Sequence, residues 1–364
     1  MTAHPSKGLT VRPVPEEEDA SWDAFVDASP TGNRFLRSDC LRMLEQTDSV
    51  GIRFERLGAF ASDGTLRGAW ALPYAQRFRV RASTYFELFY AGPMLAPELE
   101  SGSVHEADER LEVLHGLAEG HGKRMHLIEA EAHPRFRDAR GIRYAGWTLQ
   151  TRYTHIWDFE SPEELFGRMN RERRRLIRRA QETYEFAPEP PETAIRDFTP
   201  VYRALMKKFD WFPSRRWERD LSARLDWLQA NGVAGVYGAR DASGVLQAAV
   251  VVLLSPQDHT VYLWRCGYDE DAGGNSVIPA LYWNACLHWR EQWGTPFYAN
   301  LGGSPHYTLA LFKDYLGAKV VPHLRLVYHR PGVSAIGWRA ARKTRYLTRC
   351  ALARARKTLA SPRS

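Results

Sequence analysis

Cysteine is scarce in this chain of 364 residues, which contains Cys40, Cys266, Cys286 and Cys350 and has no CxxC pair. This spacing argues against a disulfide framework and a zinc ribbon. It predicts a reduced intracellular protein, and we expect a cytoplasmic location. The histidines also lack a recognised metal-ligand spacing, so we expect no metal site. The four nearest to one another are His115, His121, His126 and His133.

Long apolar runs are also missing. The longest, VLQAAVVVLL at 245–254, is far shorter than the roughly 20 residues that a membrane-spanning helix needs. It is typical of a buried strand. The first twenty residues have no apolar segment of the kind found in signal peptides.

Acidic residues are absent from the last fifty positions. Residues 315–364 contain twelve Lys or Arg and no Asp or Glu, whereas residues 1–314 have 38 basic and 43 acidic residues. The positive excess of the whole protein therefore lies in this final segment. Such a segment favours a polyanionic partner, either nucleic acid or an anionic membrane surface, or it serves only as a solubilising tail.

The chain contains an internal repeat. Residues 57–69 (LGAFASDGTLRGA) align without gaps with 237–249 (YGARDASGVLQAA), and each segment predicts a hairpin. An aromatic strand, a helix ending at a glycine, another strand and a final long strand follow in both halves. We predict two copies of one mixed α/β domain, at residues 1–158 and 159–335, followed by a basic helical tail at 336–364. No GxGxxG motif opens a helix after a first strand, which disfavours a Rossmann domain.

An arginine-rich helix is predicted at the junction of the halves, within SPEELFGRMNRERRRLIRRAQETYEF. Ser161 and Glu164 have the spacing of a capping box, and Pro162 suits the first helical position. Seven arginines fall within twelve residues against one acid. Their mutual repulsion suggests a phosphate-bearing partner, although a solvated linker helix is the simpler alternative.

An aromatic segment follows, FDWFPSRRW at 209–217. Aromatic side chains beside arginine suit recognition of a nucleotide or a sugar-peptide. They equally suit the edge of the core between two helices.

The two halves together resemble the FemABX-type aminoacyl-tRNA-dependent transferases, which have tandem GNAT-like domains. The resemblance covers roughly residues 20–330. It is carried by YAGP in the first half, by RLIRRA in the arginine helix, by YLWRCGY, and by the glycine pair that precedes LFKDYLG. Related sequences are also labelled as GNAT or BioF2-like acyltransferases.

The resemblance implies a function and a set of site residues. The function is aminoacyl transfer from a charged tRNA, as co-substrate and without a further cofactor, to a primary amine of a peptidoglycan precursor or another small peptide or natural product. The match places Lys313 beside the reacting ester in the second domain, with Tyr298 and Asn300 at the strand opening. We expect Trp211, Arg215, Tyr262, Trp264, Arg265 and Phe312 at the substrate, and Arg174, Arg175, Arg178 and Arg179 at the tRNA.

The chain departs from the family at Ala299-Asn300, where many relatives have Tyr-Asp, and an asparagine cannot act as a base. No Ser-His-Asp triad is evident in the sequence, because GGSPH lacks the closing glycine of a nucleophile elbow.

One alternative is an acyl-CoA-dependent GNAT N-acyltransferase. Asp269, Glu270 and Asp271 would repel a pyrophosphate at the corresponding loop, which disfavours it. A non-catalytic protein that binds RNA or a membrane is the other alternative.

Overall fold

The computed structural model describes residues 8–77, 79–83, 86–100, 104, 106–208, 214–269 and 274–330. The predicted basic tail at 336–364 and the predicted substrate residue Trp211 lie outside these residues. The described chain forms two compact units. Unit 1 contains the residues up to Thr154 together with Ser255–Asp258 and 321–330, and unit 2 contains His155–Leu254 and His259–Val320.

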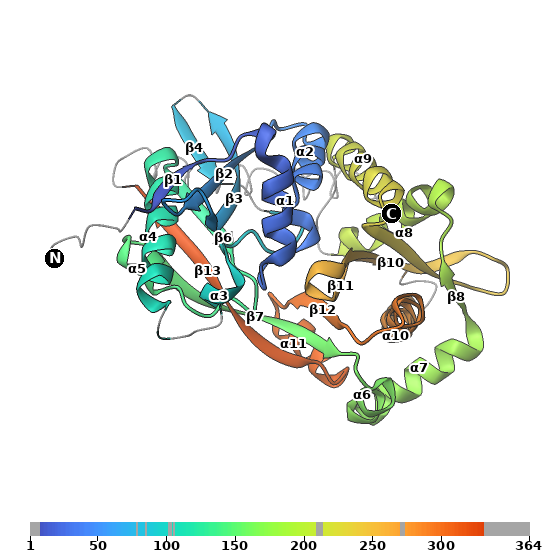
Figure 1. Ribbon diagram of the computed structural model, residues 1–364. Helices are drawn as coiled ribbons and strands as arrows, with labels where there is room; N and C mark the ends of the chain where they lie inside the picture. Colours follow the sequence, from blue (N-terminus) through green and yellow to red (C-terminus); the bar gives the residue numbers. More distant parts are fainter. Residues whose placement is uncertain are drawn as a thin grey trace. The chain divides into compact units, whose positions relative to one another are not determined.

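Unit 1 is built on a mixed sheet with the strand order β1-β2-β3-β4-β6-β13 (Figure 1). In addition, β5 pairs with β3. Its strands are β1 (Thr10–Pro13), β2 (Arg53–Phe60), β3 (Leu66–Arg77), β4 (Val80–Ser83), β5 (Met94–Leu95), β6 (Leu127–Glu131) and most of β7 (Thr148–Asp158) and β13 (Lys319–His329). Its helices are η1 (Glu16–Glu18), α1 (Asp19–Ala28), η2 (Arg34–Leu36), α2 (Ser38–Thr47), α3 (Pro97–Glu100), α4 (Ala107–Arg124), α5 (Arg140–Tyr144) and η3 (Pro256–Asp258).

Unit 2 repeats this plan with the strand order β7-β12-β11-β10-β9-β8, to which β7 contributes His155–Asp158. The other strands are β8 (Glu185–Pro188), β9 (Ala234–Arg240), β10 (Leu246–Ser255), β11 (Thr260–Tyr268) and β12 (Tyr298–Gly303). The helices are α6 (Pro162–Arg168), α7 (Arg171–Thr183), α8 (Pro191–Lys208), α9 (Arg215–Ala230), α10 (Gly274–Trp293) and α11 (Tyr307–Tyr315).

The two predicted hairpins are equivalent residue by residue. Gly58 pairs with Ala69 in unit 1, and Gly238 pairs with Ala249 in unit 2, with the same irregularity one step further along each hairpin. Both turns close through a glycine with positive φ, Gly64 at 84° and Gly244 at 80°. Residues other than glycine rarely adopt this backbone conformation. A glycine is therefore favoured at the equivalent position of both turns. The predicted repeat is therefore confirmed at the level of register.

Residues 246–254 of the apolar run lie in strand β10, which has helices on both faces, whereas Val245 precedes the strand and is exposed. On β10, Val250 and Val252 pack into one core with α7 and α10, whereas Ala249 and Val251 pack into another with α8 and α9. Because successive strand residues point to opposite faces, a strand covered on both sides is apolar at every position. Every residue of β10 is buried, as the sequence predicts.

The last strand of the second half belongs to unit 1. Along β13, Arg325–His329 pair antiparallel with Glu131–Leu127 of β6. Residues 321–330, which the sequence analysis assigns to the domain at 159–335, therefore lie in unit 1, and unit 1 ends its first segment at Thr154 rather than at 158. Strand pairing with a partner almost 200 residues away decides this assignment.

The arginine-rich segment is broken into two helices. The Ser161 side chain caps α6 by accepting a hydrogen bond from the Glu164 amide at 3.4 Å. The chain then leaves the helical conformation at Met169, and Asn170 caps α7 by accepting from the Glu172 amide at 2.8 Å. Because the Asn170 side chain can cap a helix N-terminus, a second helix, α7, begins directly after it.

We expect Gly267→Ala to destabilise unit 2, because β11 packs directly against the backbone of α8 at this glycine. A Cβ at Gly267 would lie 2.5 Å from the Tyr202 backbone nitrogen, a contact that no change of rotamer can relieve. Overpacking of this kind costs about 1–3 kcal/mol of unfolding free energy, measurable by denaturant titration. Gly167→Ala is the control, since nothing lies within 4 Å of its Cβ, and alanine favours a helix by up to about 1 kcal/mol. A Gly267 variant as stable as its control would contradict this packing.

Candidate active site

Lys313 is a buried cation in the last turn of α11. It is 4% exposed, and its ammonium donates to the carbonyl oxygens of Gly302 at 2.9 Å and Gly303 at 2.8 Å. An ammonium has three N–H donors. Two of them are used in contacts among the described residues. The predicted catalytic lysine is therefore held in place by the glycine loop that follows β12.

The loop adopts its shape because of Asn300 and Gly302. Gly302 has a φ of 75°, in the left-handed region that favours glycine. The Asn300 side chain is buried and accepts a hydrogen bond from the Gly302 amide at 2.8 Å. This contact fixes the turn from which the two carbonyls reach Lys313. The structure thus gives Asn300 a positioning role, which an amide can fill although it cannot act as a base.

The strands beside Lys313 pair over a short stretch. Thr260–Tyr262 of β11 run parallel to Tyr298–Asn300 of β12, and both strands continue beyond this register. The carbonyls that bind Lys313 belong to this continuation. Lys313 therefore lies beside the part of β12 that extends past its pairing with β11.

Burial lowers the pKa of Lys313 from 10.5 to about 8. A charged ammonium loses hydration in a protein interior, and this favours the neutral amine. Burial likewise raises the pKa of the neighbouring Cys266 thiol and raises the pKa of Tyr282 well above its usual value, so both stay protonated at neutral pH. Lys313 is the group of the three that titrates near physiological pH.

Three polar residues that sequence reasoning missed lie beside this loop. Ser304 Oγ lies 3.4 Å from His155 Nδ1, and Asp314 Oδ1 lies 3.4 Å from His155 Nε2. Ser304 follows the two glycines and Asp314 follows Lys313, but His155 comes from β7. No local spacing connects a residue at 155 with residues at 304 and 314, and only the pairing of distant strands brings them together.

The remaining predicted residues of β11, β12 and α11 lie in different surroundings. Tyr298 is 42% exposed at the start of β12, about 16 Å along the strand from Gly303. The Tyr262 side chain is fully enclosed by protein. Phe312 packs against the core, with its ring under the Arg173 guanidinium at 5.4 Å and edge-on to Tyr282.

Arg265 forms a stack with aromatic rings of three elements. Its guanidinium lies 4.7 Å from the ring centre of Trp264 and 5.4 Å from that of Trp217, and it donates to the Tyr202 hydroxyl at 3.1 Å. Cation–π contacts of this kind order a guanidinium. Arg215 is the first residue of α9, the helix that contains Trp217, and it is exposed.

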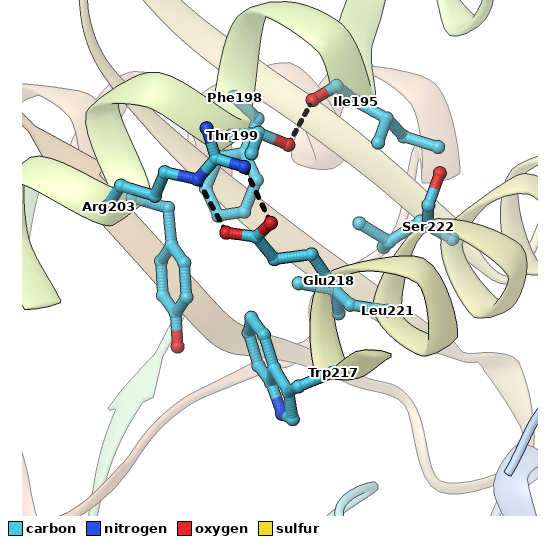
Figure 2. Close-up of a pocket in the computed structure, with 10 residues that line it drawn as sticks. Ile195, Phe198, Thr199, Arg203, Trp217, Glu218, Leu221 and Ser222 are labelled. Carbon is cyan, nitrogen blue, oxygen red and sulfur yellow. Dashed lines mark hydrogen bonds and ion pairs between the residues drawn. The ribbon is translucent and has the colours of Figure 1, made fainter. Parts of the chain in front are cut away.

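Figure 2 shows the pocket between α8 and α9, where Trp217 and the Arg203–Glu218 ion pair line the wall. The pocket has room for about one water molecule. Trp217 also stacks on Tyr202. The aromatic segment therefore serves, at Trp217, as the edge of the core between two helices, which was one of the two readings of the sequence.

The four predicted tRNA-binding arginines share the outer surface of α7. Arg175, Arg178 and Arg179 are exposed and Arg174 is half-buried. They line a groove along α7. Among the described residues, Glu172 forms an ion pair with Arg175 at 3.0 Å, and the four arginines outnumber the two acidic residues, Glu172 and Glu182, that line the same groove.

Residues 166–309 match the model of the acetyltransferase (GNAT) domain family. No curated protein matches the sequence. Among solved structures, FemX is similar with a TM-score of 0.63 at 13% identity, covering 86% of this chain and 96% of FemX. The chain has a tandem GNAT fold.

Two further solved structures are similar to this chain. A tandem GNAT protein from the clavulanic acid biosynthesis pathway, solved without AcCoA, has a TM-score of 0.54 at 12% identity and covers 89% of this chain and all of its own. L-PGS from Bacillus licheniformis has a TM-score of 0.50 at 15% identity, covering 90% of this chain and 95% of its own. The predicted fold of FemABX type is confirmed, and the match to the GNAT domain family lies within the second half, at residues 166–309.

Two negative findings apply to the described part of the tandem GNAT chain. None of its helices is both long and apolar enough to cross a membrane. Within the same residues, no three His, Cys, Asp or Glu side chains converge in a way that could hold a metal ion.

The lowered pKa of Lys313 predicts a pH-dependent stability. Between pH 8 and 10.5 the unfolded chain keeps a proton on this lysine that the folded chain has lost, so this contribution to stability rises with pH. We expect wild type to gain about 3 kcal/mol of unfolding free energy relative to Lys313→Met across this range. Denaturant titrations of both proteins at several pH values measure the difference. If the difference in unfolding free energy between the two proteins did not change with pH, folding would not lower the pKa of Lys313.

Proposed function

We propose that this protein transfers an aminoacyl group from a charged tRNA to a primary amine, and that Lys313 stabilises the negative charge that develops on the ester carbonyl oxygen. The donor ester is already activated. The protein therefore has to align donor and amine, stabilise the oxyanion, and help the ribose oxygen leave. The acceptor is an amine of a peptidoglycan precursor or of another small peptide or natural product.

The observation that carries this proposal is the direct packing of the arginine helix on the helix that bears Lys313. The Asn170 amide, at the start of α7, donates to the Tyr315 carbonyl of α11 at 2.9 Å. Arg173 stacks over Phe312, the residue before Lys313. A cationic surface long enough to contact several phosphates thus adjoins the buried ammonium within unit 2.

This arrangement suits a donor with a large polyanionic carrier. Phosphate contacts from Arg174, Arg175, Arg178 and Arg179 would position the tRNA, and the acylated end would reach the Gly302–Gly303 loop. Arg265, Trp264 and Arg215 offer stacking and anion-binding groups for the acceptor. The basic tail, through nucleic acid or an anionic membrane surface, would add to the attraction for polyanions. The fold shared with FemX and L-PGS supports this assignment.

An acyl-CoA donor is the second candidate, because the matched domain family is described as acetyltransferase and the clavulanic acid relative is named with AcCoA. A pyrophosphate would need the amides at the start of α10. Asp269, Glu270 and Asp271 immediately precede that helix. Their negative charge opposes such binding and places this candidate second.

One experiment separates the donors. The purified protein is incubated with labelled aminoacyl-tRNA pools or labelled acyl-CoA and a panel of peptide and small amines, with and without RNase pretreatment. We expect an amide product from aminoacyl-tRNA that disappears after RNase treatment. Equal product from acyl-CoA, indifferent to RNase, would instead establish the CoA-dependent reaction.

A further inference from the structure

A hydroxyl, an imidazole and a carboxylate meet in order at the end of β12. Ser304 Oγ lies 3.4 Å from one ring nitrogen of His155, and Asp314 Oδ1 lies 3.4 Å from the other. The His155 side chain is 4% exposed, whereas Ser304 is half-buried and Asp314 is 44% exposed. The Ser304 hydroxyl and the Asp314 carboxylate are therefore accessible, whereas the imidazole that contacts both of them is enclosed by protein.

The carboxylate favours one of the two neutral forms of the imidazole. An ionised Asp314 only accepts hydrogen bonds, so it favours the tautomer with the hydrogen on Nε2, the nitrogen that faces it. In that tautomer the lone pair of Nδ1 faces Ser304. In this tautomer the Ser304 hydroxyl can pass its proton to the imidazole.

The surroundings keep the imidazole neutral. Burial and the Lys313 ammonium lower the pKa of His155 below its ordinary 6.5, while Asp314 and the backbone of Gly302 oppose this shift only in part. The charged groups around the ring are Lys313 and Asp314, both on α11, and β12 presents the Gly302 backbone and Ser304. A neutral imidazole at pH 7 is ready to accept a proton.

The reaction needs such an acceptor. An amine that attacks an ester gains a positive charge and must lose a proton before the C–N bond is stable. At pH 7 Lys313 is below its pKa of about 8 and is mostly protonated already, and Asn300 has no basic atom. Neither residue that the sequence places at the reacting centre can take the proton.

We propose that Ser304 and His155 relay the proton of the attacking amine, with Asp314 as the positioning residue, an inference that rests on the proposed aminoacyl transfer. The amine nitrogen bonds to the ester carbonyl carbon and gives a proton to Ser304 Oγ as the Ser304 proton moves to His155 Nδ1. The bond from that carbon to the ribose oxygen then breaks. The imidazolium returns its proton through Ser304 to the departing oxygen, so no proton is gained or lost overall.

The first test removes the hydroxyl. We expect Ser304→Ala to lower kcat about a hundredfold, the lower end of what a positioned proton acceptor supplies, with KM within about threefold of wild type. Ser304→Thr keeps the hydroxyl and should recover most of the loss. Because Ser304 is half-buried, both full-length variants should fold, which a thermal melt checks.

The second test uses the pH dependence of kcat/KM. Wild type should lose activity on the acid side as His155 becomes protonated, below pH 6.5. Asp314→Asn removes the charge that favours the imidazolium, so this limb should move to lower pH. Glu119→Gln is the matched control, because Glu119 lies 3.5 Å from His115 in unit 1, and it should leave the profile unchanged.

The outcomes separate the relay from the donor assignment. No transfer by wild type from either donor would overturn the proposed function and the relay with it. Wild-type transfer with Ser304→Ala at full kcat, or with an acid limb that Asp314→Asn does not move, would overturn the relay alone. An aminoacyl adduct found on Ser304 by mass spectrometry after quenching would also overturn it, in favour of a covalent acyl-serine step.

Discussion

Lys313→Met should lower turnover by about a hundredfold or more, with little effect on folding at neutral pH. Methionine keeps much of the apolar length of lysine but removes the ammonium that binds the Gly302 and Gly303 carbonyls. Loss of one preorganised donor to a developing oxyanion costs about 3 kcal/mol of transition-state stabilisation. The measurement is single-turnover transfer from aminoacyl-tRNA to the best acceptor amine.

Lys319→Met is the control for this variant. Lys319 is basic and close in sequence, but its side chain is 57% exposed and pairs with Asp158 at 3.3 Å. An exposed ion pair of this kind contributes little, and turnover should stay near wild type. If Lys313→Met also remained within a few-fold of wild type, Lys313 would be a structural residue that only fastens α11 to the glycine loop.

Replacing Arg174, Arg175, Arg178 and Arg179 together with Gln should abolish most of the affinity for tRNA. Each phosphate contact contributes about 0.7 to 0.9 to the slope of log binding constant against log salt concentration, so four lost contacts should reduce that slope by about three. Filter binding of uncharged tRNA at several salt concentrations measures it. Folding should survive, because none of the four side chains is fully buried.

A second quadruple variant controls for net charge. Arg53, Lys123, Arg140 and Arg143 are exposed in unit 1, and their replacement by Gln removes the same four charges. We expect this protein to bind tRNA with nearly the wild-type slope. Equal losses in the two variants would show that overall charge, and not the α7 surface, attracts the tRNA.

The sequence was sufficient for the features that depend on neighbouring residues. Gly64 and Gly244 marked turns that the structure forms with the same register in both units. Ser161 marked a helix start that its side chain caps. A turn depends on the backbone freedom of one glycine, and a helix cap depends on a hydrogen bond between residues two or three positions apart. Both can therefore be predicted from a local sequence pattern.

The site was only partly predictable. The family resemblance led to Lys313 and to Asn300, and the structure shows the contacts that position both. The family resemblance could not show that the Tyr262 side chain is enclosed. Strand β11 is covered on both faces only after distant helices pack on it. The sequence analysis predicted one arginine-rich helix, whereas the structure has two, α6 and α7. Besides the Asn170 cap, a hydrogen bond from the Asn170 amide to Tyr315 holds the chain at this break, and local sequence does not reveal that contact.

By itself the sequence determined that this protein has two copies of one α/β plan, a long buried strand in the second copy, an arginine-rich helix between them, and a lysine after a glycine pair. Tertiary structure alone decided that β13 completes the sheet of unit 1 and that His155 lies beside Ser304 and Asp314. The physical reason is range. Local conformational preferences act over a few residues, whereas strand pairing and burial join residues more than a hundred positions apart, at a cost in chain entropy that only the whole packed core offsets.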